Sequence, residues 1–254
     1  MAFDAYSRYY DLLYRDKDYA AEAQYVAGAL RRHAPQAKRL LELGCGTGGH
    51  AEHLARAGYA VDGFDVSDTM LARAAARRAT LPPEVAARLS FGRGDARSLR
   101  VGKAFDAVIS LFHVMNYQTT DADLRAAFAT AAAHLRPRGV FLYDFWFGPA
   151  VVAQRPELRV RRLEDEAVRV TRIAEPVLHE AQCVVDVNYD VFVEDKSSGH
   201  VAQVRETHSM RYLFLAELAE LRGAAFVERA THAWLTQEAP GTGAWSAFQI
   251  VERV

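Results

Sequence analysis

The sequence lacks the features that identify several large classes of protein. It contains two cysteines, Cys45 and Cys183, which are too few for a disulfide framework and belong to no CxxC or Cys/His cluster. No apolar run reaches the length of about 18 residues that a transmembrane helix needs, and the N-terminus has no apolar signal segment. We therefore expect a cytoplasmic protein that holds no metal ion.

An excess of charge of one sign is also missing. Lys and Arg together number 31 and Asp and Glu 32, so the net charge is −1, and lysine occurs at only four positions. Proteins that coat nucleic acid or an anionic membrane need a concentrated positive field. The charge balance therefore predicts no nucleic acid and no membrane as a partner, although it leaves room for a local basic patch.

What the sequence does contain is a hydrophobic period that changes along the chain. Residues 6–33 have apolar positions at helical spacing before Pro35 interrupts them. From 39 to 145, short apolar runs alternate with helical segments, which predicts βαβ crossovers and a mostly parallel sheet covered by helices on both faces. We expect strands at 39–43, 60–64, 89–92, 107–111 and 139–145, and helices at 48–57, 67–78 and 121–135.

After Pro149 the period becomes two. Apolar and polar residues alternate from 158 to about 215, which is typical of antiparallel strands with one face in water. The small polar residues 196–199 predict a hairpin turn, and a helix at 216–225 and strands at 227–235 and 244–251 are expected to follow. The pattern predicts an α/β core, made of residues 36–149 and 214–254, that is interrupted by an antiparallel β insertion at 150–213.

The sharpest local pattern is a glycine-rich loop between the first predicted strand and the helix after it. Gly44, Gly46 and Gly48 lie at alternate positions there, and glycines at such a junction let the backbone approach a ligand and adopt positive φ. The loop also satisfies the dinucleotide pattern GxGxxG when Gly49 is taken as its third glycine. The glycines alone therefore leave a nicotinamide cofactor open.

Acidic residues at neighbouring strand ends narrow the choice of cofactor. Asp65 ends the second predicted strand, Asp95 follows the third, and Glu42 precedes the loop. One carboxylate can accept both hydroxyls of a ribose, and another can accept an adenine amine. A pyrophosphate needs a bare helix N-terminus, for which Glu42 is poorly placed. Each residue alone is explained equally well as a turn or a cap, but their joint occurrence at three strand ends favours a ligand there.

The loop resembles the E-x-G-x-G-x-G segment of class I methyltransferases that use S-adenosylmethionine, and the residues from Asp65 to Leu71 resemble the D-x-S-x-x-M-L helix start of that family. The resemblance implies a Rossmann-like seven-stranded sheet, S-adenosyl-L-methionine as cofactor and S-adenosyl-L-homocysteine as product. It implies that Asp65 holds the ribose hydroxyls and that Asp95 accepts the adenine amine. The cofactor-binding residues expected on this basis are Glu42, Gly44, Cys45, Gly46, Gly48, Asp65, Val66, Met70, Asp95, Ala96 and Leu111.

Over essentially its whole length the chain resembles a narrower group, the N,N-dimethyltransferases of nucleotide-linked amino-deoxysugars. The aromatic segment from Tyr6 to Tyr14 looks like the N-terminal segment of that group, which implies a helical lid over residues 1–35. The resemblance also implies that the insertion contributes to acceptor binding and to a possible homodimer. The group often has a His near the position of Asn116 and a Glu at the position of Asp144, so this chain departs from it on the acceptor side.

The ends of the fourth and fifth predicted strands must face the transferred methyl group, so the acceptor site is expected there. An amine that arrives deprotonated needs little beyond orientation, whereas an alcohol needs a general base. His113 is the most economical base, with Asp144 to orient it, although a histidine packed under the lid explains it equally well. The expected catalytic residues are His113, Tyr10 and Asp144, and the expected substrate contacts are Asn116, Tyr117 and Trp146.

Residues further along the chain are assigned structural roles. Tryptophans of the closing strands are expected in the core, with contact between one of them and the acceptor as the alternative. Histidines of the insertion are expected at solvent-facing positions, and so are its arginines, with a site for the diphosphate of a nucleotide-linked sugar as the alternative for the arginines. These residues include Trp234, Trp245, His179, His208 and Arg159.

The leading hypothesis is transfer of a methyl group to a small-molecule acceptor, namely an amine of a nucleotide-linked sugar or a comparable metabolite. A second hypothesis keeps the cofactor and makes an oxygen or a heterocyclic nitrogen the acceptor, with His113 as the general base. A third is a non-catalytic module of the same fold that binds a partner through its insertion. Protein and nucleic-acid acceptors are disfavoured because residues 110–113 do not match the N/D-P-P-Y/F motif of such enzymes.

Overall fold

The main sheet has seven strands in the order β10-β11-β5-β4-β1-β2-β3. The computed structural model of the chain describes residues 12–254. Neighbouring strands from β5 to β3 are parallel, whereas β11 is antiparallel to both β5 and β10, so the predicted fold class is confirmed. The strands are β1 (Arg39–Leu43), β2 (Ala60–Asp65), β3 (Leu89–Arg93), β4 (Phe105–Ser110), β5 (Leu135–Trp146), β10 (Phe226–Ala233) and β11 (Ser246–Arg253).

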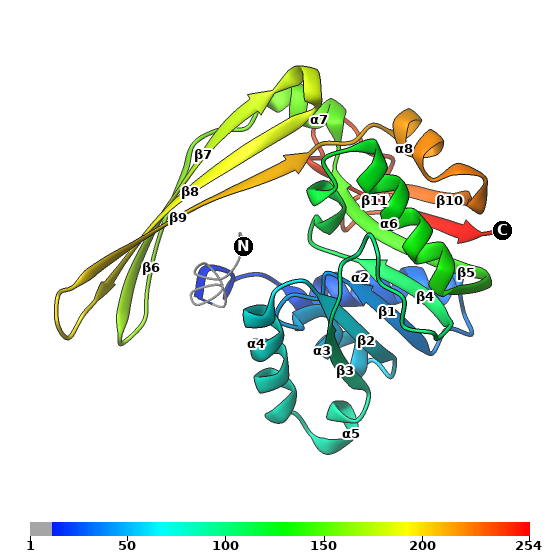
Figure 1. Cartoon of the computed structure of the whole chain (residues 1–254), viewed down its shortest axis with the longest axis horizontal. Coiled ribbons are helices and arrows are strands. Elements are labelled where there is room, and N and C mark those ends of the chain that lie inside the picture. The colour runs from blue at the N-terminus through cyan, green and yellow to red at the C-terminus, as the bar shows by residue number, and fades with distance from the viewer. Residues whose placement is uncertain (1–11) are drawn as a thin grey trace.

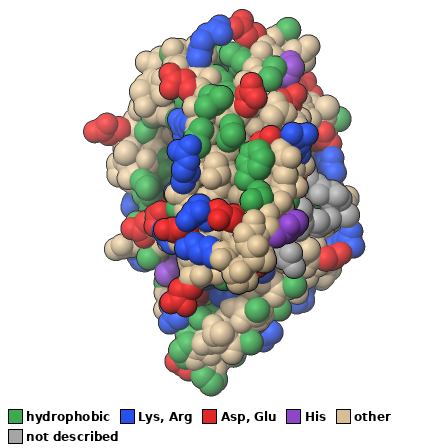
Figure 2. All heavy atoms as spheres, turned by 90° about the vertical axis from the view of Figure 1, so that its left-hand side faces the viewer, with side chains coloured by type: hydrophobic (Ala, Val, Ile, Leu, Met, Phe, Trp, Pro, Cys, Tyr) green, Lys and Arg blue, Asp and Glu red, His purple; other side chains and the backbone are tan. Residues whose placement is uncertain are grey.

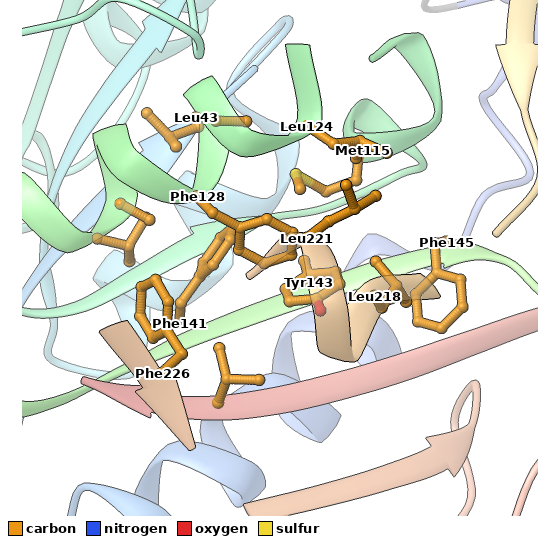
Figure 3. Packing of buried hydrophobic residues seen from close by; sticks show 14 of the residues in the cluster. Leu43, Met115, Leu124, Phe128, Phe141, Tyr143, Phe145, Leu218, Leu221 and Phe226 are labelled. Carbon is orange, nitrogen blue, oxygen red and sulfur yellow. The ribbon is translucent and has the colours of Figure 1, made fainter. Parts of the chain in front are cut away.

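Helices cover both faces of the main sheet (Figure 1). One face packs against α2 (Tyr19–His33) and α3 (Gly49–Arg56), and the other against α6 (Asp121–His134) and α8 (Leu215–Leu221). Side chains of β5 alternate between the two cores: Phe141 and Tyr143 pack against Phe128 of α6, whereas Leu142 joins the opposite core. Figure 3 shows the aromatic side of this arrangement. Burial on both faces explains why β5 is a nearly continuous apolar run in the sequence.

The remaining helices are shorter or lie at the edges of the sheet. They are α4 (Asp68–Ala79), α5 (Pro83–Ala86) and α7 (Gly148–Gln154), with single-turn helices η1 (Val114–Tyr117), η2 (Glu180–Gln182) and η3 (Gly223–Ala225). The pattern analysis did not predict α5 or α7, since neither is long enough to show a helical period. No helix in the described part of the chain combines the length and the apolar composition needed to cross a membrane.

The expectation of one helix over residues 6–33 is wrong in the part that the structure describes. Leu12 and Leu13 are helical, the chain then turns, and α2 begins at Tyr19. The side chain of Asp18 caps α2 by accepting a hydrogen bond from the amide of Ala21 at 2.8 Å. A capping aspartate competes with continued helix because its side chain takes the place of a backbone acceptor.

A second sheet, called the arm sheet here, consists of four antiparallel strands in sequence order. They are β6 (Arg159–Glu164), β7 (Val168–His179), β8 (Val184–Asp195) and β9 (Val201–Arg211). Its hairpins extend away from the main sheet (Figure 1). The predicted turn joins β8 to β9, where the Asp195 carboxylate accepts the amides of Ser197 and Ser198, each at 2.9 Å. The division of the chain into domains stays a prediction.

The arm sheet has one apolar face and one polar face, as its period of two predicts. Val170, Val191 and Val193 are buried and pack around Leu13. The opposite face carries polar pairs such as Ser209 with Asp186 and Thr207 with Asn188. Figure 2 views the molecule from the side of the arm sheet, and acidic and basic side chains are interspersed on the described surface there.

Candidate active site

A cavity of about 530 Å³ lies where the chain order of the main sheet reverses, outside the carboxyl ends of β1, β2 and β4. Ligands of open α/β sheets bind at this position. Side chains of the arm sheet form part of its wall. The described residues lining the cavity are Tyr14, Tyr19, Gly44, Cys45, Gly46, Thr47, Gly49, His50, Asp65, Val66, Met70, Gly94, Asp95, Ala96, Arg97, Leu111, Phe112, His113, Val114, Tyr117, Gln118, Trp146, Arg159, Tyr189, His208, Met210 and Trp245.

The glycine loop forms the floor of this cavity between β1 and α3. Gly44, Gly46 and Gly48 have φ values of 75°, 53° and 76°, in the left-handed region that favours glycine. A Cβ atom on Gly44 would lie 2.5 Å from Cγ2 of Val114, so a larger residue has no room there. The sequence therefore requires glycine at this position for a conformational and a steric reason, and Gly44 and Gly46 both line the cavity.

Asp65 lies at the end of β2 and borders the loop. Its carboxylate accepts the amide of Gly46 at 2.8 Å and that of Ser67 at 2.9 Å. Burial raises the pKa of this carboxyl, and the backbone hydrogen bonds oppose that shift. The side chain is therefore held rigidly in the cavity wall, where its remaining lone pairs can accept hydroxyl donors.

Glu42 lies behind the loop and does not line the cavity. Its side chain is 1% exposed, and among the described residues its Oε2 has no hydrogen-bond partner. Burial and the neighbouring charge of Asp65 raise the pKa of Glu42 to about 8. The nearest basic group is the imidazole of His50, whose Nδ1 lies 4.0 Å from Oε1. A positively charged ligand group at the loop would stabilise the ionised form of this carboxylate.

Asp95 is in the cavity wall, as predicted, but its oxygens are already engaged. Arg97 donates to Asp95 from Nη2 at 2.6 Å and also pairs with Asp123 at 3.0 Å. The hydrogen bonds from Arg97 hold the pKa of the Asp95 carboxyl below its usual value. An adenine amine would therefore share Asp95 with Arg97, and the proposed adenine contact stays a prediction.

His113 lines the cavity in a loop with unusual backbone geometry. Phe112 and His113 have φ values of 62° and 66°. The amide of His113 donates to both carboxylate oxygens of Asp144, at 3.1 and 3.2 Å. His113 Nδ1 lies 2.8 Å from Asp144 Oδ2, but the ring N–H does not point at this oxygen well enough to form a hydrogen bond. Asp144 is 1% exposed and outside the cavity lining, so it holds the His113 loop from behind.

Two of the three predicted substrate contacts, Tyr117 and Trp146, line the cavity. The third, Asn116, does not, so the prediction that its side chain contacts a substrate does not fit its position. The Asn116 side chain is fully buried, donates from Nδ2 to the carbonyl of Arg211, and accepts the amide of Trp146 at 3.1 Å. A buried amide in this position satisfies backbone groups of both sheets. Tyr10 lies outside the described residues.

The insertion was expected to contribute to acceptor binding, but the residues of the arm sheet that line the cavity were not predicted individually. The expectation that His208 faces solvent is wrong, because the residue is 4% exposed and lies in the cavity wall with Tyr189, Met210 and Arg159. A period of two shows which residues share a face but not which face turns inward. His179, in contrast, is on the outer face beside Asp186, at 2.9 Å, as predicted.

Other lining residues lie in the expected N-terminal lid and in a closing strand, where no single residue had been assigned to the site. Tyr14 and Tyr19 reach the cavity from the segment before and at the start of α2, and Trp245 reaches it from the residues before β11. Trp234 has the core position expected of it, against Tyr25 and Phe248. Aromatic side chains are equally common in cores and ligand pockets, so residue type alone did not separate these cases.

The donor and acceptor groups of the cavity fit S-adenosylmethionine. Asp65 and Asp95 are acceptors for hydroxyl and amine donors, and the buried carboxylate of Glu42 lacks a hydrogen-bond partner at Oε2 among the described residues. Arg97 and Arg159 are the guanidinium groups among the described lining residues, no lysine is among them, and Arg97 is neutralised by two aspartates. The loop and its neighbours therefore present hydrogen-bond acceptors to the cofactor, and the positive charge of the cofactor would favour ionisation of Glu42.

Fold and cavity together define a methyltransferase of the Rossmann-like class. The family model described as a methyltransferase domain matches residues 40–139, which contain the glycine loop and both aspartates. The chain is 33% identical to the dTDP-3-amino-3,6-dideoxy-alpha-D-glucopyranose N,N-dimethyltransferase of Streptomyces fradiae over 75% of this chain and 72% of the relative. The chain belongs to the methyltransferase family that contains this enzyme, and the cofactor of the family is S-adenosylmethionine.

Other comparisons agree with this assignment. The chain is 40% identical to the dTDP-3-amino-3,4,6-trideoxy-alpha-D-glucopyranose N,N-dimethyltransferase of Streptomyces venezuelae, but the match spans only 57% of this chain and 58% of the relative. Among solved structures, Streptomyces venezuelae DesVI has a TM-score of 0.79 at 27% identity, covering 98% of each chain. CalS10 of Micromonospora echinaspora, an amino pentose methyltransferase with bound S-adenosylmethionine, has a TM-score of 0.75 at 28% identity, covering 100% of this chain and 98% of its own.

Proposed function

We propose that the protein transfers methyl groups from S-adenosylmethionine to the amine of a nucleotide-linked amino sugar. The observation that carries the proposal is that the glycine loop, the carboxylates of Asp65 and Asp95 and the inner face of the arm sheet share one cavity. Its volume is in the range of small-molecule sites. Several relatives are named as N,N-dimethyltransferases of dTDP-linked amino sugars, which supports this class of acceptor.

The residues of the cavity supply orientation. When bound, S-adenosylmethionine provides a methyl group on positively charged sulfur. Asp65 is placed to accept the ribose hydroxyls, and Glu42 and Asp65 offset positive charge at the loop. Tyr117, Trp146 and Trp245 also line the cavity and offer aromatic surface on which the acceptor can be oriented. An amine nucleophile with a free lone pair then needs alignment more than activation, and alignment can contribute about 7–11 kcal/mol.

The direct test is methyl transfer to dTDP-3-amino-3,6-dideoxyglucose, followed by mass spectrometry. We expect products that carry one and two added methyl groups on nitrogen. Asp65→Ala should reduce the affinity for S-adenosylmethionine by tenfold or more in calorimetry, because it removes the ribose acceptor. Absence of cofactor binding by the wild-type protein would contradict the proposal and favour a non-catalytic module.

A second candidate function is methylation of an oxygen or a heterocyclic nitrogen with His113 as the general base. The 2.8 Å approach of His113 Nδ1 to Asp144 is the observation that favours it, because a carboxylate beside one ring nitrogen can orient the imidazole toward an acceptor. With an amine acceptor, His113→Ala should lower kcat only a few-fold. A loss of 100-fold or more, with transfer to a hydroxyl acceptor by the wild type, would favour the second function instead.

We further propose a homodimer and a cytoplasmic location. Exposed apolar side chains of the arm sheet and the segment before it, Leu158, Val160 and Val177, support an additional contact surface. Cys45 and Cys183 are not joined in a disulfide, which supports a reducing compartment. Sedimentation equilibrium tests the dimer: Val177→Glu should shift the protein toward monomer if this surface pairs two copies.

A further inference from the structure

Three polar side chains from two distant segments are joined at the cavity wall. The hydroxyl of Tyr117, in η1, lies 2.8 Å from Nδ1 of His208 in β9. Nε2 of His208 lies 3.3 Å from Oε2 of Glu206 on the same strand. The side chains of His208 and Glu206 are only 3% and 9% exposed. Orientation of the cofactor and of the acceptor amine does not require any of these polar contacts.

The carboxylate of Glu206 determines how the imidazole is protonated. A carboxylate beside Nε2 favours a proton on that nitrogen, which leaves Nδ1 as the acceptor for the Tyr117 hydroxyl. This is the order of groups in a hydroxyl–imidazole–carboxylate triad. The groups therefore form a directed chain from the cavity to Glu206.

The surroundings keep the phenol of Tyr117 neutral. Burial, together with Tyr189, Tyr14, Asp65 and Glu206, raises the pKa of Tyr117 well above its usual value. The ring of Tyr189 packs edge-on against the imidazole of His208, with centroids 5.0 Å apart.

The basic groups on this face come from β7 and β6. The guanidinium of Arg172, in β7, lies 5.2 Å from the centre of the Tyr189 ring and bonds the hydroxyl of Tyr14 at 3.3 Å. Arg159, in β6, lines the cavity. Both side chains are on the face of the arm sheet that carries His208, and they oppose a build-up of positive charge on the imidazole.

Glu206 is at the end of the chain of groups that is remote from the cavity. Tyr117 and His208 line the cavity, whereas Glu206 does not. The Glu206 side chain is on the same face of the arm sheet as His208 and is 9% exposed, so water reaches part of it. A proton that reaches Glu206 has therefore left the cavity lining and can pass to water.

Double methylation of an amine needs such an exit. In each transfer the nitrogen lone pair forms the N–C bond while the C–S bond breaks and its electron pair stays on sulfur. The nitrogen then carries one proton more than the neutral methylamine, and it has no lone pair for a second transfer. One proton must leave between the two transfers.

We propose that Tyr117, His208 and Glu206 form a proton path that deprotonates the acceptor ammonium before each methyl transfer. The proposal rests on the proposed function, an amine acceptor in this cavity. The Tyr117 oxygen accepts the ammonium proton while its own proton moves to His208 Nδ1. The resulting imidazolium is stabilised by the Glu206 carboxylate and releases one proton through it to solvent. One proton enters the path and one leaves it.

The test compares mono- and dimethylated product from dTDP-3-amino-3,6-dideoxyglucose across pH, in wild type, Tyr117→Phe and Glu206→Gln. At about pH 7 we expect both variants to lose about tenfold or more in rate and to accumulate monomethyl product. The defect should shrink at about pH 9, where water removes the proton. Ser209→Ala is the matched control, because Ser209 neighbours His208 but bonds Asp186 on the outer face.

A second readout does not depend on activity. In NMR titrations with bound S-adenosylhomocysteine, Glu206→Gln should lower the pH at which the His208 ring titrates, because the imidazolium loses its carboxylate partner. An unchanged product ratio and pH profile in both variants would overturn the proton path while leaving the proposed function intact. If the wild type methylates no sugar amine, the proposed function fails and the path fails with it. If Tyr117→Phe does not fold, Glu206→Gln alone decides.

Discussion

Glu42 is a carboxylate whose surroundings disfavour its charge. It is 1% exposed, and burial and Asp65 raise its pKa to about 8. In an unfolded chain the group ionises near its ordinary value of 4.5. Between pH 4.5 and about 8 the folded protein therefore keeps a proton on Glu42 that the unfolded chain releases. Proton binding by Glu42 therefore stabilises the folded state fully below about pH 4.5, and this contribution to the free energy of unfolding is lost as the pH rises to about 8.

Glu42→Gln should remove this loss, because glutamine is neutral at every pH and keeps the shape. Without cofactor, we expect the variant to melt roughly 5 °C or more above wild type at about pH 9, and at the same temperature as wild type at about pH 5. Calorimetric melting at both pH values measures the difference. Glu84→Gln, on the exposed helix α5, is the control and should change neither value. An equal shift at both pH values would show that the effect is not due to ionisation.

A substitution at Gly44 tests the steric requirement for glycine at the floor of the cavity. An alanine there would keep a φ of 75° and place its Cβ 2.5 Å from Val114 Cγ2. Gly102→Ala is the matched control, because Gly102 has a φ of 65° and no atom within 4 Å of the added Cβ. We expect about 1 kcal/mol of destabilisation in the control and about 2–4 kcal/mol in Gly44→Ala. Urea unfolding measures both, and equal losses would contradict the steric argument.

The single-turn helix η1 joins the main sheet to the arm sheet. Its residue Asn116 satisfies the carbonyl of Arg211, at the end of β9, and the amide of Trp146, at the end of β5. Two neighbours on the same element, Met115 and Tyr117, face the core and the cavity respectively. One short element therefore determines how the arm sheet and the cavity wall are positioned.

Asn116→Ala should be costly for this reason. It leaves two buried backbone groups without partners, at about 1–3 kcal/mol each, so we expect about 2–5 kcal/mol of destabilisation. We also expect lower kcat, because the Tyr117 side chain moves with η1. Asn188→Ala, which removes an amide bonded to Thr207 on the outer face, should cost less than about 1 kcal/mol. Denaturant unfolding and steady-state kinetics check the pair, and equal costs would rule out the joining role.

Short elements are also the ones that the sequence pattern does not predict. The strands β1, β2 and β3 and the helices α3 and α4 have nearly the predicted bounds, because each shows its own period. In contrast, η1, α5 and α7 contain too few residues to show one. The segment before α2 has helical spacing on both sides of Asp18, and only the capping hydrogen bond shows where the new helix begins.

At the scale of the whole molecule, the cavity belongs to both sheets. The protein groups expected to bind the cofactor lie at the carboxyl edge of the main sheet. The wall expected to contact the acceptor includes Arg159, Tyr189 and His208 of the arm sheet. Binding of the two ligands should therefore protect different parts of the chain. Protection from hydrogen exchange reports such local stabilisation.

We expect S-adenosylhomocysteine alone to slow amide exchange several-fold in residues 44–49 and to have little effect on β9. Addition of dTDP-3-amino-3,6-dideoxyglucose should then slow exchange in β9 as well, because the acceptor contacts the arm sheet. Mass spectrometry of peptides measures both, and peptides of α5 serve as the internal control. Protection of β9 by the cofactor alone would contradict this division of the cavity.

The sequence by itself determined the fold class and the cofactor loop. Both depend on local physical requirements: positive φ at three glycines between β1 and α3, and acidic side chains placed directly after buried strands. Only the tertiary structure decided the acceptor wall. Exchanging the two faces of the arm sheet leaves its alternating pattern unchanged, so the pattern could not show that His208 and Tyr189 turn inward. Contact of the arm sheet with η1 and the main sheet determines which face turns inward. The same contact brings Glu206 and His208 together with Tyr117, which is 91 residues before His208 in the sequence.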